Sequence, residues 1–417
     1  MNILLKSAKI IDASSEFHLK KRDILIVNGK IEKIAGKIDA PNKTTKVIAL
    51  KNLHVSVGWF DSGVCFGEPG YEERETIANG LLTAAKSGYT DVVLNPDTNP
   101  VPDSSSDIVF LKNASRGHAT NLHPLGTLTA KAEGSDLAEL FDMKNAGAIG
   151  FYDFKGPVEN PNLLKIALQY AQNFDGLVYS FPLDKNIAGK GIVNEGHVST
   201  KLGLKGIPAF AEEIQIARDL FVLEYTGGKL HIPNISTAGS VKLIAEAKKK
   251  GFDVSCSVAV HNLRFTDTVL EEYDSKYKVI PPLRTNNDIK ALIKGVKDGT
   301  VDFVTTDHRP MNIETKAVEF DNSANGTIGL ESAFGTLNQF FDLETTIRVV
   351  TYGRERYGLP SESLEEGSRA CLTLFDPTTE YVFEESHIAS ASKNSMFLGN
   401  RLKGRALGII NNGQAVL

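Results

Sequence analysis

The sequence predicts an α/β protein: a (β/α)8 barrel with a small composite β-sandwich domain formed by both ends of the chain. The chain has 417 residues, of which 41% are hydrophobic and 23% are charged, so it can bury one large core and a smaller one. In the middle of the chain, short apolar runs alternate with helical stretches, which is typical of βαβ units. We expect the β domain to comprise residues 1–54 and 366–417, and the barrel residues 55–365.

At both ends of the chain, apolar and polar residues alternate in the way that is typical of β-strands. The first part contains "NILLKSAKII", "DILIVNGKIEKIAG" and "KVIAL", and the last part contains "RLKGRALGIINNGQAVL". Asn28-Gly29 and Asn412-Gly413 are typical of tight hairpin turns. A single β domain built from both ends is therefore expected.

Eight apolar runs follow in order between these ends, and eight is the number of strands that closes such a barrel. They are "GWFDSGVCF", "TDVVLN", "NLHPLGT", "AIGFYDF", "GLVYSF", "KLHIPNI", "FDVSCSVAV" and "VDFVTT".

Two of the intervening stretches have clear helical patterns. Residues 72–87 begin with Glu72, Glu73 and Glu75, which suit the positive end of a helix dipole, and end at Gly88. Residues 208–226 open with Pro208 and place Phe210, Ile214, Ala217 and Phe221 on one apolar face. The aperiodic residues 307–331 follow the eighth strand, and we expect them to form a loop on the substrate side of the barrel.

Composition and charge exclude several classes of protein. The net charge is −5 and the basic residues are scattered, so nucleic acid and anionic membranes are poor partners. No apolar run approaches the roughly 20 residues of a membrane span, and the first residues lack the features of a signal peptide. Three widely spaced cysteines indicate neither a disulfide framework nor a structural zinc site. We expect a cytoplasmic protein in which Cys256 and Cys371 are small buried hydrophobes.

Several motifs resemble the dihydroorotase family of the amidohydrolase superfamily, in the right order and over almost the full length. "FGEPGYEERETIANGLLTAAKSGYTDVVLNPDTNPVPD" is similar to the family's HFREPGxxxxETxxxGxxAAxxGGxTxVxxMPNTxPxxD. "GIPAFAEEIQIARDL", "NISTAGSVKLI", "KVIPPLR" and "VTTDHRPMNIETK" resemble IPxxxExxxIARDxxL, HVSTxxSxxxI, KMNPPLR and IATDHAPHxxxEK. The resemblance implies a barrel of the amidohydrolase type.

Enzymes of this family hydrolyse a cyclic amide, dihydroorotate, with one or two zinc ions. The metal lowers the pKa of a bound water and polarises the carbonyl, and an aspartate on the eighth strand carries the proton. That position is Asp307 here. The resemblance thus implies a site of converging imidazole and carboxylate ligands at the barrel mouth.

The zinc-ligand histidines of the family are replaced in this sequence. Gly63 and Cys65 stand for the two histidines of the first strand, Ser180 for that of the fifth and Asn234 for that of the sixth. The fourth-strand carboxylate is kept as Asp153. Asp61, beside these positions, is expected to orient other groups rather than to bind metal.

The residues at the family's substrate-binding positions are also replaced in this sequence. Gly67 replaces the arginine, Asp97 and Ile280 replace two asparagines, and Met311 replaces a histidine, while Arg309 replaces an alanine. Loss of an arginine and gain of an aspartate should disfavour a carboxylate substrate.

A remnant metal site would have to combine Asp153, Asp307, His308 and Cys65, with His261. We expect no cofactor, and zinc only if this remnant set binds it. His231 and His261 are expected to be buried histidines without a catalytic role. Cys65 could act as a nucleophile only beside a base, and no GxSxG, GxGxxG or Walker motif suggests another chemistry.

We therefore expect a catalytically inactive, dihydroorotase-like protein with a structural or regulatory role in pyrimidine biosynthesis. The resemblance implies aspartate carbamoyltransferase as the partner, because family members without metal ligands assemble with that enzyme, and it implies a homo-oligomer, a dimer. Two alternatives stay open: an active dihydroorotase or other cyclic-amide hydrolase with an atypical site, and a sensor that binds a small molecule in the barrel mouth.

Overall fold

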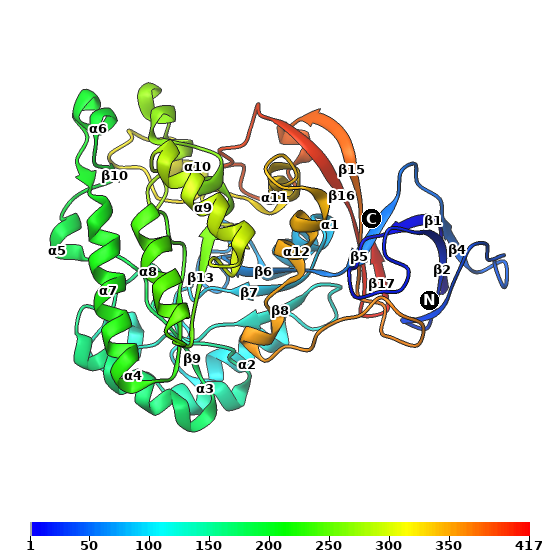
Figure 1. Cartoon of the computed structure of the whole chain (residues 1–417), viewed down its shortest axis with the longest axis horizontal. Coiled ribbons are helices and arrows are strands. Elements are labelled where there is room, and N and C mark those ends of the chain that lie inside the picture. The colour runs from blue at the N-terminus through cyan, green and yellow to red at the C-terminus, as the bar shows by residue number, and fades with distance from the viewer. Residues whose placement is uncertain (1) are drawn as a thin grey trace.

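A parallel barrel forms the larger part of the molecule, in a computed structural model that describes residues 2–417. Its helices surround the barrel strands, and the terminal sheet lies at one side (Figure 1). Seven strands of the barrel are β6 (Trp59–Val64), β7 (Tyr89–Leu94), β8 (Asn121–Pro124), β9 (Leu177–Tyr179), β12 (Lys229–Ile232), β13 (Val254–Ala259) and β14 (Phe303–Thr305).

The fourth predicted strand is reduced to a short pairing segment that closes the gap between β8 and β9. Phe151 bridges Gly126 on one side and Val178 on the other, and its N–H donates to the Leu177 carbonyl at 3.0 Å. Val64 bridges His308 on the far side of the ring. The eight strand positions therefore close into the barrel that the sequence predicts.

The helices mostly follow their predicted strands, with one changed boundary. They include α1 (Ile77–Lys86), α2 (Ser105–Ala114), α3 (Leu140–Ala146), α4 (Pro161–Ala171), α7 (Ala209–Thr226), α8 (Ala238–Lys249), α9 (Asn286–Asp298), α11 (Leu330–Leu337) and α12 (Leu343–Thr351). Helix α1 begins at residue 77 rather than 72, because the Thr76 side chain accepts from the Asn79 N–H and caps it. The predicted dipole partner Glu72 instead accepts from the Gly70 N–H in the preceding turn, at 2.9 Å.

Helix α7 has the predicted length but presents the opposite face to the barrel. Its buried side includes Glu212, Gln215, Asp219, Leu220 and Leu223 among other residues. The predicted apolar face, which carries Phe210, Ile214 and Phe221, is exposed to solvent. Apolar periodicity located the helix correctly, and the structure shows that its apolar stripe faces solvent.

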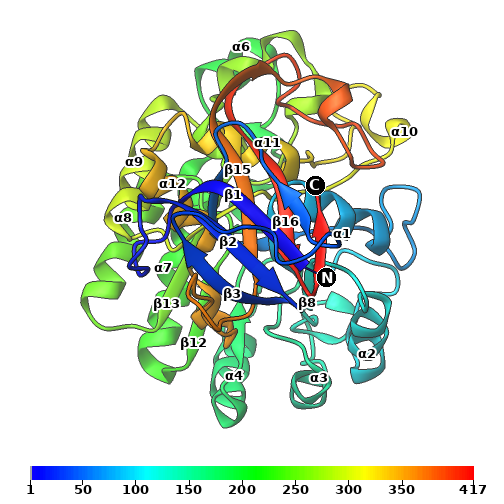
Figure 2. The ribbon, with the colours of Figure 1, turned by 90° about the vertical axis from the view of Figure 1, so that its right-hand side faces the viewer.

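Both ends of the chain build one eight-stranded sheet. The order is β17 (Gln414–Val416), β16 (Arg401–Asn411), β15 (Leu372–Val382), β5 (His54–Val57), β1 (Asn2–Ile10), β2 (Lys21–Val27) and β3 (Lys30–Ala35), with β4 (Lys46–Ile48) on β1. Figure 2 shows the N-terminal strands beside β15 and β16. Both predicted Asn-Gly turns are present, with positive φ at Asn28, Gly29, Asn412 and Gly413.

The connection between β15 and β16 returns from the terminal sheet to the barrel mouth. There the Asn394 side chain accepts from the Met311 N–H at 3.1 Å and donates to the Arg309 carbonyl at 3.1 Å. Residues 307–331 contain the short helix α10 (Ile313–Lys316). The long loop after the last barrel strand is therefore fastened by a segment of the C-terminal part of the chain.

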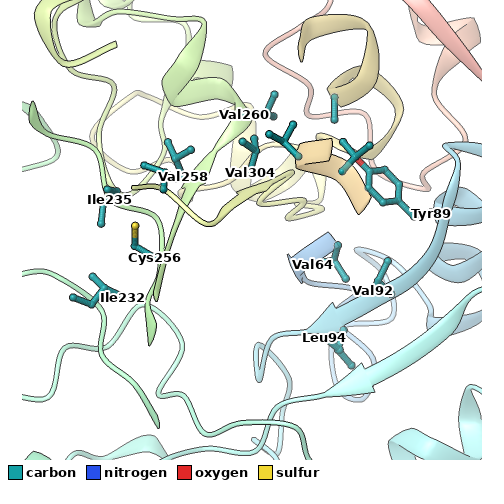
Figure 3. Close-up of a cluster of buried hydrophobic side chains, with 14 of the residues drawn as sticks. Val64, Tyr89, Val92, Leu94, Ile232, Ile235, Cys256, Val258, Val260 and Val304 are labelled. Carbon is teal, nitrogen blue, oxygen red and sulfur yellow. The ribbon is translucent and has the colours of Figure 1, made fainter. Parts of the chain in front are cut away.

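The barrel strands contribute a continuous apolar core. Figure 3 shows Val64 and Val92 on one side of this cluster and Val258 and Val304 on the other, with Cys256 drawn between Ile232 and Ile235. Cys256 and Cys371 are both buried, free thiols, as predicted. Among residues 2–417, none of the helices combines the length and apolar character needed to cross a lipid bilayer.

Candidate functional site at the barrel mouth

The candidate site lies where the barrel strands end, and an ion pair occupies it. Lys155, just after the fourth strand position, places its Nζ 2.8 Å from Oδ2 of Asp307. The Asn234 side chain donates to the other oxygen, Oδ1, at 2.9 Å. The Lys155 and Asp307 side chains are 7% and 3% exposed. Both oxygens of Asp307, the aspartate that the resemblance predicts as the proton shuttle, thus accept hydrogen bonds from other side chains of the chain.

Small and neutral groups fill the first-strand positions. A Cβ atom on Gly63 would lie 3.3 Å from both the Asn95 side chain and Thr305 Oγ1. The Asn95 amide also lies 3.7 Å from Cys65 Sγ. Burial raises the pKa of the Cys65 thiol well above its usual range, which disfavours the thiolate needed for metal binding or nucleophilic attack.

Asp61 holds the first strand to the last, in the orienting role that the sequence suggests. Its Oδ1 accepts from Thr305 Oγ1 at 2.7 Å and from the Gly63 N–H at 3.1 Å. Its Oδ2 accepts from the Thr306 hydroxyl. Burial raises the pKa of Asp61 to about 6. Both carboxyl oxygens therefore accept hydrogen bonds from groups of the barrel wall itself.

Asp153 points away from the mouth, so its inclusion in a remnant metal set is not supported. Its Oδ1 accepts from the Leu128 and Thr129 N–H groups, and its Oδ2 accepts from Thr129 Oγ1 at 2.6 Å. Because successive residues of an extended chain point to opposite sides, the mouth is lined instead by the neighbours Tyr152 and Phe154. Two aromatic rings take the place of a ligand from this strand.

Ser180 shows the same one-residue displacement. Its hydroxyl donates to Asp219 on helix α7 at 2.6 Å, outside the barrel. Tyr179, the preceding residue, lines the mouth, and its ring stacks on that of Tyr152 with centroids 5.2 Å apart. Phe181 belongs to the same buried aromatic cluster. The fifth strand thus turns an aromatic side chain toward the mouth, whereas Ser180, the predicted counterpart of the family's histidine, faces outward.

Within residues 2–417, none of the remaining histidines hydrogen-bonds to the Asp307 carboxylate, although His231 lines the same cavity. His308 accepts from the Gly329 and Leu330 N–H groups at the start of α11, at 3.2 and 3.4 Å, which directs it away from the mouth. His231 contacts the Ser255 hydroxyl at 2.9 Å. Neither ring nitrogen of the fully buried His261 hydrogen-bonds to any group of residues 2–417. Burial lowers the pKa of His261 and of His308 to about 4, so both rings are neutral at pH 7.

Asp97 and Arg309, two departures from the family pattern, form a pair. Arg309 Nε and Nη2 donate to the two Asp97 oxygens at 2.8 and 3.0 Å. Burial by itself would raise the pKa of Asp97, but the charge of Arg309 holds it below its usual range. The expectation that Asp97 adds free negative charge to the mouth was therefore wrong, because the guanidinium neutralises it.

The other positions that the resemblance assigns to substrate binding carry glycine or apolar residues. Gly67 has a φ of +93°, and a Cβ there would lie 2.7 Å from the Tyr71 carbonyl oxygen, which excludes an arginine on this backbone. Ile280 packs against the aromatic cluster of the barrel interior. Met311 is buried beneath the β15–β16 connection, where its N–H donates to Asn394.

These side chains leave almost no space at the mouth. The cavity there has a volume of about 10 Å3 and is lined by Gly63, Asn95, Tyr179, Asn234, Asp307 and neighbouring residues, which is room for about one water molecule. Within residues 2–417, no group of three or more His, Cys, Asp or Glu side chains is placed to hold a metal ion. The donor set does not fit the zinc site of the family.

Sequence reasoning missed Lys155, Asn95 and the aromatic residues Phe154 and Phe181. A strict alternation count along the fourth strand would have placed Phe154 on the same side as Tyr152. The lysine had no such signal, because it forms its ion pair with a residue 152 positions away in the sequence.

A pH dependence follows from His261. The unfolded chain binds a proton at a pKa near 6.5 and the folded chain at about 4, so this group destabilises the protein as pH falls from 6.5 to 4. We expect His261→Leu to gain about 2 kcal/mol relative to wild type between pH 7.5 and pH 5, measured by urea unfolding. The exposed His197→Asn should track wild type; equal slopes for wild type and His261→Leu would contradict the assignment.

Comparisons with known proteins agree with the motifs. The family model described as Dihydro-orotase-like matches residues 54–240. A dihydroorotase of Pelotomaculum thermopropionicum is 38% identical, and one of Geotalea daltonii is 36% identical; each alignment covers 100% of this chain and 99% of the relative.

Solved structures share the fold at lower sequence identity. The L-hydantoinase (dihydropyrimidinase) of Arthrobacter aurescens superposes with a TM-score of 0.85 at 20% identity, covering 99% of this chain and 95% of its own. A D-hydantoinase gives a TM-score of 0.80 over 100% of this chain. The barrel is thus of the amidohydrolase type, and the full-length identity to dihydroorotases shows that the chain belongs to the dihydroorotase family.

Proposed function

We propose that this chain is a dihydroorotase-like protein of pyrimidine biosynthesis that has lost hydrolysis and acts in a structural or regulatory role. The observation that carries the proposal is the Lys155–Asp307–Asn234 cluster, in which an ammonium and an amide occupy both oxygens of the proton-shuttle aspartate. A carboxylate held in this way is a poor general base, because its lone pairs already accept strong hydrogen bonds.

Charge balance also supports the loss of metal. A zinc ion beside Asp307 would be repelled by the Lys155 ammonium 2.8 Å from that carboxylate. The positions facing the mouth on the fourth and fifth strands carry aromatic rings, which supply no zinc ligand. The cluster supplies internally the positive charge that the family's aspartate otherwise receives from the metal.

The small volume of the barrel-mouth cavity favours this proposal over an active hydrolase or a small-molecule sensor. Ligand sites usually enclose roughly 300 Å3 or more, whereas the barrel mouth encloses about 10 Å3. An active cyclic-amide hydrolase and a small-molecule sensor would each need the Lys155 pair or the aromatic side chains to move aside. The structural role requires no such rearrangement.

The assembly role has a specific candidate partner, aspartate carbamoyltransferase, and the proposed compartment is the cytoplasm. The support is the family membership of the chain, since dihydroorotase-like family members without metal ligands assemble with that enzyme. We expect the purified proteins of one organism to co-elute on size exclusion and the carbamoyltransferase activity to change on mixing. Separate elution together with unchanged activity would contradict this partner.

Metal analysis and a dihydroorotase assay test the loss of catalysis. We expect well below one zinc per chain after purification with added zinc, and no hydrolysis of dihydroorotate above the buffer rate. One or more zinc ions per chain, with turnover abolished by Asp307→Asn, would instead establish an active hydrolase.

A thermal-shift series with dihydroorotate and carbamoyl aspartate addresses the sensor. We expect the melting temperature to stay constant across the series, whereas a concentration-dependent rise would favour a sensor.

A further inference from the structure

Helix α7 carries an apolar stripe on its solvent-exposed side. Phe210, Ile214, Phe221 and Tyr225 are 50%, 46%, 74% and 77% exposed. Together with Ala217 they are spaced by 4, 3, 4 and 4 residues, which keeps them on one side of the helix. This spacing is that of a seam between two packed helices. We call these five residues the α7 stripe.

The stripe is not needed to hold α7 on the barrel, because polar contacts on the other side of the helix do so. Glu212 accepts from the Ser236 N–H at 2.7 Å and from the Ser240 hydroxyl at 2.6 Å. Asp219 binds the Ser180 hydroxyl. The inward side of α7 thus combines these polar residues with apolar ones such as Ile216 and Leu220, and the α7 stripe lies on the outward side.

Helix α4 extends the patch. It packs against α7, and its residues Ile166 and Tyr170 are 43% and 41% exposed. At roughly 200 Å2 for a fully exposed aromatic side chain, the stripe and these two residues expose on the order of 600 Å2. A standard interface buries about 800 Å2 on each partner. The patch is thus large enough to form most of one side of a stable interface.

The order of residues along the stripe is compatible with a two-fold axis. In an antiparallel pair of α7 helices centred between residues 217 and 218, Phe210 meets Tyr225 of the second copy and Ile214 meets Phe221 of the second copy. The small Ala217 lies at the centre, where two helix backbones can approach closely. Charges of both signs, such as Lys165 and Glu224, border the patch, so two identical surfaces carry no net repulsion.

From this geometry we propose that the α7 stripe is the two-fold interface of a homodimer, with a second copy of this chain as its occupant. An isologous interface needs one self-complementary patch, and the stripe pairs large side chains with large ones around a small centre. The proposal does not depend on whether the barrel mouth is catalytically active.

Sedimentation of the full chain tests the interface directly. We expect wild type to sediment as a dimer at micromolar concentration and the double variant Phe221→Glu/Tyr225→Glu to sediment as a monomer with an unchanged circular dichroism spectrum. The matched control is Phe110→Glu, at another surface phenylalanine that is 47% exposed, and this variant should stay dimeric. A monomeric wild type, or a dimer that survives the double variant, would overturn the proposal.

Cysteine cross-linking gives a readout that does not rely on disrupting the protein. The three native cysteines are buried, so a new surface thiol reacts alone. Ala217→Cys lies beside the proposed axis and should form a disulfide-linked dimer on mild oxidation. Ile214→Cys and Phe221→Cys should cross-link to each other when mixed, and much less when each is oxidised separately. Failure of Ala217→Cys to cross-link would contradict the two-fold arrangement.

Discussion

Lys155→Met is expected to lower the free energy of unfolding by about 3–5 kcal/mol at pH 7.5, because it leaves the Asp307 carboxylate buried without its cation. The pair is 2.8 Å long and both side chains are nearly inaccessible. Urea unfolding of wild type and Lys155→Met at pH 7.5 measures this loss.

Two further variants isolate the contribution of the pair. The double variant Lys155→Met/Asp307→Asn removes both charges and should be more stable than Lys155→Met alone, as a double-mutant cycle would show. Lys201→Met provides the surface control, because Lys201 and Glu271 are 53% and 51% exposed and such pairs contribute about 0.5 kcal/mol. If Lys155→Met costs no more than Lys201→Met, the buried ion pair does not stabilise the fold.

The second large effect is expected from restoring a single family residue. Asp97→Asn should lower the free energy of unfolding by about 2–3 kcal/mol, because it strips Arg309 of a bidentate partner in a largely buried setting. Arg309→Ala should be destabilising for the complementary reason. Because the pKa of Asp97 is lowered in the fold, the difference between wild type and Asp97→Asn should shrink below about pH 4.

The coupling of these two positions is the decisive measurement. The double variant Asp97→Asn/Arg309→Ala carries both family residues and should lose clearly less stability than the sum of the single variants. Thermal or urea unfolding of the four proteins completes the cycle. Strict additivity would mean that the two replacements are independent and that their contact is incidental.

The terminal sheet and the barrel were predictable because their signals are local. Turn residues such as Asn28-Gly29 and the alternation of apolar runs with helical stretches fix the type and order of the elements without knowledge of distant contacts. The one weak strand, around Phe151, still occupies its place in the ring through hydrogen bonds to both neighbours.

The side chains that line the barrel mouth were less predictable, because a shift of one residue moves a side chain to the other side of a strand. Asp153 and Ser180 illustrate this: each was assigned to the mouth, yet each bonds to groups outside it. The Lys155–Asp307 pair depends on tertiary structure alone. Helix α7 shows a related limit, since apolar periodicity locates a helix and its apolar face without specifying whether the protein interior covers that face.

The terminal sheet has a consequence for how the chain is made. Strand β5 pairs with β1 on one side and with β15 on the other, and β15 leaves the ribosome several hundred residues after β5. The edge of β5 that pairs with β15 therefore stays unpaired while the entire barrel is synthesised. Unpaired edges invite association between chains, so the growing chain is open to such association until β15 has paired with β5.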